Sequence, residues 1–501
     1  MSSLKRIKKK PEIIVLSIIF LFRIVYFLYL DYVFTPDSSE YISRDGFAWL
    51  HGSVDRYRLP VYPMLIDLCQ FISEAYYSLV VCIVQLLISL LSIVVLYWTL
   101  KKLTDKKGIC LLVTFLYGTM SATSGWDKTL LTESLSLSLT VFIIFGIVSY
   151  IKDKKYRYII ITTICLIISS FLKAVFTIYA GMFFVFLILI TIFPGKHEEK
   201  STIAKLRKVN LKSALISFIP IIFICAYAFT FNNLYGGFTL SDSGLGQQVY
   251  VVVASGYYKD STDTEIKEIA EYILNTPSNC TVKNNLNGLV SEFYKDFDVS
   301  NEEKEQIKEQ MLSLVDNTLN EPTENWIDEF LDMRYDNLYN CDVSEAANLA
   351  RFYIMGNFDR DRVAQFVSEA KMNNLSLYIT KIVSNLFYRY ESISVINGLP
   401  LSIWVTSLFE NLLFFLEFSI IHSLIISLIE IVIFLVALIK KKKTDWIRLG
   451  LGVYVLATIF LSVFGTNADF ARTAITSIPF MFVAIAMYID SIYKYLFKRD
   501  T

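Results

Sequence analysis

Long apolar runs alternate with short polar connectors along most of the chain. A helix that crosses a membrane needs about 20 mainly apolar residues. Runs of this kind occupy residues 12–34, 76–100, 108–125, 129–150, 157–174, 176–194, 212–231, 415–439, 447–464 and 473–493. Only a short break near Lys173 separates the fifth run from the sixth. The pattern predicts an all-α multispanning membrane protein with about ten transmembrane helices.

One long polar segment, residues 232–402, interrupts this pattern. Its opening, 235–258, has several glycines and a β-branched run, which favours a loop and a strand. Apolar residues then recur at helical spacing over 263–275, 300–319, 343–356 and 361–390. The chain is therefore expected to divide into a membrane domain (1–231, seven spans), a mostly helical insert (232–402) and a C-terminal membrane segment (403–501). The amphipathic stretch 375–390 suits a helix lying along the membrane surface.

The distribution of charge orients the predicted spans. The chain is 54% hydrophobic and 19% charged with a net charge of zero, which gives no electrostatic reason to expect a nucleic-acid partner. Lys and Arg concentrate in every second connector, and such connectors face the cytoplasm. Both termini are thus expected on the cytoplasmic side of the cell membrane. The insert and the connectors 34–75, 120–128 and 464–472 are expected on the outer side. In an oxidising space Cys280 and Cys341 could form a disulfide, but their spacing does not establish one.

The first outside connector carries more chemistry than a link between helices needs. Residues 36–63 read PDSSEYISRDGFAWLHGSVDRYRLPVYP, and the other outside connectors add further charges. Acids beside cations suit a substrate with a phosphate, because cations hold the phosphate and an acid takes a proton from an incoming hydroxyl. Simpler interpretations remain open: Asp37 could cap a helix starting near Ser39, Glu133 could be a paired structural acid, and Lys173 and Arg472 could be interface anchors.

Three separated motifs resemble the GT-C superfamily of integral-membrane glycosyltransferases. The likeness is greater to the branch of protein O-mannosyltransferases and lipid A aminoarabinose transferases. The motifs are Pro36-Asp37-Ser38 with Tyr41 and then Tyr57-Arg58-Leu59-Pro60-Val61-Tyr62-Pro63; Leu131-Thr132-Glu133-Ser134-Leu135; and Ala468-Asp469-Phe470-Ala471-Arg472 with Ile478-Pro479. Leu59 stands where a second proline is common, and Ala471 where a second basic residue is often found. The insert matches no family motif, which leaves the acceptor open.

The resemblance implies transfer of a hexosyl or pentosyl group from a polyprenyl-phosphate donor to a glycan, lipid or protein at the outer face of the bilayer. Asp37 would be the catalytic base. Supporting residues would be Glu40, Tyr41, Tyr57, Glu133 and Asp469, and the donor phosphate would lie on Arg58, Lys173 and Arg472. The reaction needs no cofactor, and although a divalent metal could bind, no Asp-x-Asp pair in the key connector indicates one.

Two other functions fit a chain of this design. A polysaccharide polymerase or ligase also combines many spans with a large outside segment, but it does not need an acidic, tyrosine-containing stretch directly after the first span. A transporter or flippase would be expected to show internal repeats and ionisable residues near the bilayer midplane. Here the charges concentrate at the outer connectors and no repeat is visible, which favours the transferase.

Overall fold

The computed structural model describes residues 10–30, 32–33, 35–192, 210–275, 343–388, 390, 419–440, 445–466 and 470–497. Asp469, Cys280, Cys341 and the predicted helix at 300–319 lie outside these residues. Within them the chain is mainly helical and contains no strand; an isolated bridge joins Val33 and Thr129. The predicted all-α class is therefore confirmed.

Seven helices of the described chain are long and apolar enough to cross a membrane, so the protein is a multi-pass membrane protein. They are α2 (Pro11–Tyr29), α5 (Tyr77–Leu103), α8 (Glu133–Asp153), the helix Asn210–Tyr235 that ends in α12 (Ile219–Tyr235), α22 (Ile420–Ile439), the helix Trp446–Val463 that contains α23 (Trp446–Phe460), and the helix Ala471–Phe497 that contains α24 (Phe470–Thr473) in part and α25 (Ile478–Phe497).

An eighth span would be broken. It would consist of α6 (Lys107–Thr119) and the segment Ser121–Lys128, which comprises α7 (Ser121–Ser124) and η2 (Gly125–Lys128), with a bend of 67° between them. The predicted fifth and sixth spans are the apolar helices α9 (Tyr156–Ser170) and α10 (Phe176–Ile192), which are 15 and 17 residues long. Each predicted apolar run thus contains a helix, and within the described residues seven or eight of them have the length expected of a membrane crossing.

Helix α8 lies at the centre of the bundle, against α5 and α9. Its buried serines and threonines are compatible with an apolar environment because their hydroxyls bond to the carbonyl one turn earlier. Ser136 Oγ donates to Thr132 O at 2.7 Å, and Thr140 Oγ1 donates to Ser136 O at 2.8 Å. Because α8 packs against both α5 and α9, the position of Glu133 at its start is fixed.

A buried ion pair attaches the bent segment after α6 to α2. Arg23 Nη1 lies 2.7 Å from Asp127 Oδ2, and Arg23 Nε donates to Gly118 O at 2.8 Å. Ser134 Oγ also donates to Asp127 Oδ1, at 2.7 Å. Both charges are compensated and hydrogen-bonded, as buried charges must be. Arg23 and Asp127 thus belong to the scaffold.

The described part of the insert is helical, and its opening differs from the sequence prediction. The expected loop is present at 236–242, but the expected strand is wrong, because the β-branched run lies in α13 (Ser243–Ala254). The valines of α13 are buried, and packing of this kind overrides β-propensity. The further elements are η3 (Tyr257–Asp260), α14 (Thr264–Asn275), α18 (Val343–Asn357), α19 (Arg360–Asn373) and α20 (Leu375–Asn385). A membrane-surface position for α20 stays a prediction.

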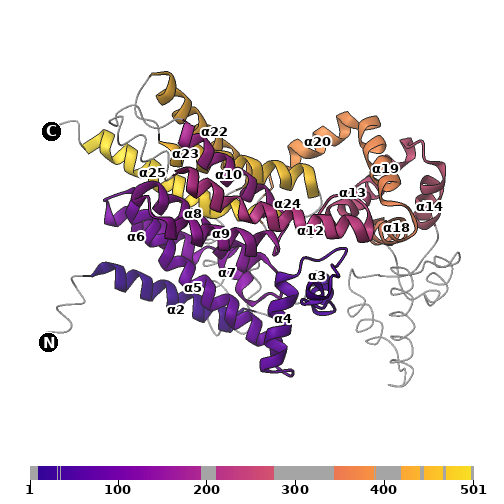
Figure 1. The fold of residues 1–501 in the computed structure, drawn as a ribbon, viewed down its shortest axis with the longest axis horizontal. Helices are drawn as coiled ribbons and strands as arrows, with labels where there is room; N and C mark the ends of the chain where they lie inside the picture. The colour runs from indigo at the N-terminus through magenta and orange to yellow at the C-terminus, as the bar shows by residue number, and fades with distance from the viewer. Residues whose placement is uncertain are drawn as a thin grey trace, which may run out of the picture.

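The arrangement of the elements places the insert at one end of the bundle. Figure 1 shows α13, α14, α18 and α19 at the end opposite to the one where α2 begins and α25 ends. The first connector is itself folded, into α3 (Pro36–Ile42), η1 (Ala48–His51) and α4 (Val61–Ile72). It lies between the membrane helices and the insert, so its side chains can meet both.

Candidate active site

A cavity of about 1250 Å³ lies where the first connector, the membrane helices and the insert meet. Its walls come from α3, the irregular stretch 57–59, the start of α8, the turn before α10, the segments 239–250 and 348–381 of the insert, and residues 461–462 and 472–473. Of the nine predicted site residues, eight line this cavity: Asp37, Glu40, Tyr41, Tyr57, Arg58, Glu133, Lys173 and Arg472. The ninth, Asp469, lies outside the described residues.

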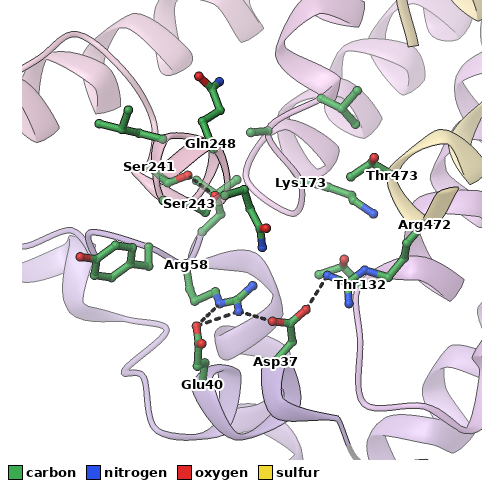
Figure 2. A pocket seen from close by; sticks show the side chains of 18 of the residues that line it. Asp37, Glu40, Arg58, Thr132, Lys173, Ser241, Ser243, Gln248, Arg472 and Thr473 are labelled. Carbon is green, nitrogen blue, oxygen red and sulfur yellow. Dashed lines mark hydrogen bonds and ion pairs between the residues drawn. The ribbon is translucent and has the colours of Figure 1, made fainter. Parts of the chain in front are cut away.

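Asp37 lies in the first turn of α3, with its carboxylate between two guanidinium groups (Figure 2). Arg58 Nη2 lies 2.6 Å from Oδ1, and Arg472 Nη2 binds Oδ2. The helix start is capped by its neighbours instead: Thr35 N donates to Ser38 Oγ at 3.0 Å, and Ser38 N donates to Thr35 O at 2.9 Å. The interpretation of Asp37 as a helix cap is therefore wrong.

The two guanidinium groups determine the protonation state of Asp37. Burial alone would raise the pKa of its carboxyl, but the charges of Arg58 and Arg472 outweigh burial and hold that pKa well below its usual range. Asp37 is therefore a permanent carboxylate, although a weak base.

Arg58 is the central cation of the first connector. Its Nε and Nη2 lie 2.7 Å from Glu40 Oε2, and its guanidinium lies over the Tyr41 ring, 4.7 Å from the centroid. Burial would lower the pKa of Arg58, but Glu40 and Asp37 raise it well above its ordinary value. Asp55 fixes the turn that presents Arg58, since Asp55 Oδ1 accepts from the Arg58 backbone N at 2.6 Å. No local sequence pattern indicated this role for Asp55.

A second group of charges joins the late motif to α8. Glu133 Oε1 lies 2.8 Å from Lys173 Nζ and 3.2 Å from Arg472 Nε. Arg472 therefore bridges Glu133 and Asp37, two acids from separate motifs. Lys173 and Arg472 are ion-paired rather than simple interface anchors, and the three predicted phosphate cations each already contact a carboxylate.

Tyr57 contributes an unused polar group to the site. Its hydroxyl is buried and has no hydrogen-bond partner within the described chain. Burial raises the pKa of Tyr57, so the hydroxyl stays protonated and available as a donor.

The insert supplies a wall of the cavity that sequence reasoning missed. Ser241 and Ser243 lie across the cavity from Asp37 and Glu40 in Figure 2, and Gln248 also lines the cavity. Arg351, on α18, and Lys381, on α20, also line it. Their charges were visible in the sequence, but no local pattern distinguished them from the other charges of a polar helical segment.

A buried carboxylate holds the insert against the first connector. Asp242 has no exposed surface, and it accepts from Arg56 Nε at 2.9 Å and from Arg360 Nε at 2.7 Å. Its backbone N donates to Arg56 O at 2.8 Å. The position of the insert wall relative to Arg58 therefore depends on this contact. Among the described residues no three His, Cys, Asp or Glu side chains group as metal ligands.

Comparison with known proteins gives little beyond this geometry. No protein-family model matches the chain, and no curated protein does. Among solved structures it is similar to archaeal oligosaccharyltransferase AglB from Archaeoglobus fulgidus in complex with an inhibitory peptide and a dolichol-phosphate (12% identity, TM-score 0.40). It is also similar to the A. fulgidus oligosaccharyltransferase tethered to an acceptor peptide containing the NVT sequon (12% identity, TM-score 0.42). Each match covers 97% of this chain and 51% of the other, so this chain spans about half the length of those proteins.

Proposed function

We propose that this protein is a membrane glycosyltransferase that moves a sugar from a polyprenyl-phosphate donor to a hydroxyl of an extracytoplasmic acceptor. The observation that carries the proposal is the meeting of Asp37, Glu133 and Arg472 in one ion-paired cavity. These residues belong to the three motifs that resemble the GT-C superfamily. Arg472 contacts both acids although it lies 435 residues after Asp37.

Asp37 is the proposed base. In the reaction the bond between the anomeric carbon and the phosphate oxygen breaks, and the acceptor oxygen forms the new bond to that carbon. The acceptor's proton passes to the Asp37 carboxylate. Because the transition state is oxocarbenium-like, the acceptor oxygen becomes acidic only as its new bond forms, and a weak but well-placed base is sufficient.

The cations around Asp37 have two proposed tasks. Arg58 and Arg472 hold the carboxylate ionised and oriented toward the cavity, and Lys173 with Arg472 does the same for Glu133. The leaving polyprenyl phosphate carries one more negative charge than the donor did, so positive charge near it lowers the barrier. A preformed network also needs little rearrangement when the substrate arrives.

The test compares Asp37→Asn with Asp45→Asn. Asp45 lies on the same connector but is exposed, and its carboxylate accepts from the neighbouring Phe47 N at 2.8 Å. Both full-length variants are assayed in membranes with labelled polyprenyl-phosphate hexoses and pentoses, and label is followed into lipid, glycan and protein fractions. We expect Asp37→Asn to lose transfer by roughly 10²- to 10⁴-fold with normal membrane insertion, and Asp45→Asn to retain it.

Retained transfer in Asp37→Asn would refute the assigned base. Mass spectrometry of envelope extracts from a deletion strain tests the reaction class. Loss of a sugar decoration supports the transferase, whereas shortened glycan chains would indicate a polymerase or ligase.

A further inference from the structure

The charges that line the cavity do not balance, and the excess comes from the insert. Seven basic and three acidic side chains line it. Asp37, Glu40 and Glu133 pair with Arg58, Lys173 and Arg472. Arg44 and Arg360 also line the cavity but pair with acids behind it, Asp55 and Asp242. Within the described chain, Arg351 and Lys381 remain without a carboxylate partner.

Arg351 is held in a position that favours an anionic ligand. Its guanidinium lies 4.3 Å from the centroid of the Phe352 ring. Its stem packs on α13, where a Cβ added to Gly246 would lie 3.7 Å from Arg351 Cδ. Burial lowers the pKa of the guanidinium, with the charge of Glu40 opposing that effect. A largely desolvated cation without an opposite charge is unfavourable, so an anion entering the cavity would be bound there.

Lys381 reaches the same cavity from α20. Its ammonium donates to Ser255 Oγ at 3.0 Å, a neutral partner that positions the group without neutralising it. Burial lowers the pKa of Lys381 as well. Two uncompensated cations on one wall match the charge of a phosphate monoester, which is about −2 at neutral pH.

We infer that the insert provides an oxyanion-binding subsite in this cavity, Arg351 assisted by Lys381, that takes a phosphate group. The inference rests on the proposed function and gives the insert a part in binding. Arg351 can offer two parallel N–H donors to a phosphate, and Lys381 adds a third. The phosphate belongs either to the departing polyprenyl carrier or to a phosphorylated acceptor.

The test measures binding, so that it is independent of transfer activity. Arg351→Met keeps the stem that packs on α13 and removes the charge. The matched control is Arg362→Met, since Arg362 lies on the insert outside the cavity and is 41% exposed. Purified full-length protein is titrated with polyprenyl phosphate and separately with inorganic phosphate, with ligand binding followed by thermal shift. We expect Arg351→Met to weaken binding about 10- to 100-fold and Arg362→Met to bind as the wild type does.

The two probes separate the sources of the phosphate. Weaker binding of both probes assigns the subsite to the carrier lipid. Weaker binding of inorganic phosphate alone assigns it to an acceptor. Unchanged binding of both would overturn the inference and would leave the outcome of the Asp37→Asn assay unaffected. If Arg351→Met fails to fold, Lys381→Met is measured in its place, with the same direction of change and the same result as refutation.

Discussion

The Asp242 carboxylate offers a direct test of what holds the insert over the cavity. It is fully buried and joins Arg56 of the first connector to Arg360 at the start of α19. The two arginine side chains are each 20% exposed. Asp242→Asn keeps the shape and one acceptor oxygen but removes the charge, which leaves two largely buried cations facing each other.

The magnitude follows from this burial. Removing one partner of a buried ion pair costs about 3–5 kcal/mol, and the remaining amide hydrogen bond offsets about 1 kcal/mol of it. We therefore expect the docked insert to lose about 2–4 kcal/mol relative to an opened state, which makes opening roughly 30- to 700-fold more frequent.

The assay is amide hydrogen exchange, read by mass spectrometry on peptides from α13 and α18 in the full-length protein. Exchange through local opening accelerates in proportion to the opening equilibrium. The control is Asp263→Asn, which removes an ion pair with Arg362. Arg362 Nε lies 2.7 Å from Asp263 Oδ2, and the Arg362 side chain is 41% exposed. Such exposed ion pairs contribute about 0.2–1 kcal/mol to stability. Asparagine at position 263 can still cap the N-terminus of α14.

The reasoning would be refuted if α13 and α18 in Asp242→Asn exchanged within about fivefold of the wild type, as expected of the control. A second variant checks the cause. Asp242→Asn combined with Arg360→Gln removes one of the two orphaned charges, so it should exchange more slowly than Asp242→Asn alone. Equal or faster exchange in the double variant would mean that charge burial is not the source of the effect.

Two further predictions concern the first connector. Because the pKa of Asp37 is lowered from its usual value of 3.8, the stabilisation that its ion pairs provide is present above that value and lost only as pH falls through the lower folded-state pKa. The transfer rate should therefore show no titration of Asp37 between about pH 5 and 8. An inflection of the pH–rate profile in that range, at a pH that shifts in Arg472→Lys, would contradict this. Gly46→Ala should destabilise the protein by about 1–3 kcal/mol or more, because its Cβ would lie 2.1 Å from Met64 N in the backbone of α4. Thermal unfolding measures this loss, against Gly108→Ala as the control, where a Cβ meets nothing within 4 Å; equal midpoints would count against it.

Local sequence determined the class of the protein because a run of apolar residues has few alternatives to a membrane helix. The apolar runs at 76–100 and 129–150 became α5 and α8, with ends shifted by a few residues. The two runs beside Lys173 became helices of 15 and 17 residues. Hydropathy predicted that these two runs are apolar helices, but it does not define where each helix must end.

Local sequence failed where packing decides the structure. The run of valines in α13 favours a strand by propensity, but burial against α18 and α19 makes it helical. The buried ion pair between Arg23 and Asp127 is a second case. Which carboxylate Arg23 meets depends on the bend after α6, which the sequence does not specify.

The candidate site shows the same division. The sequence by itself singled out Asp37, Arg58, Glu133, Lys173 and Arg472, because acids beside cations in the predicted outside connectors suit a phosphate substrate and because several of these residues lie in motifs that resemble a known family. Only the tertiary structure decided that these five groups and Glu40 neutralise one another in one network, and that Arg351 and Lys381, cations of the same cavity, come from the insert. The physical reason is that a residue's cost of burial can be inferred from its own neighbourhood in the chain, whereas the partner that compensates its charge is chosen by how distant helices pack.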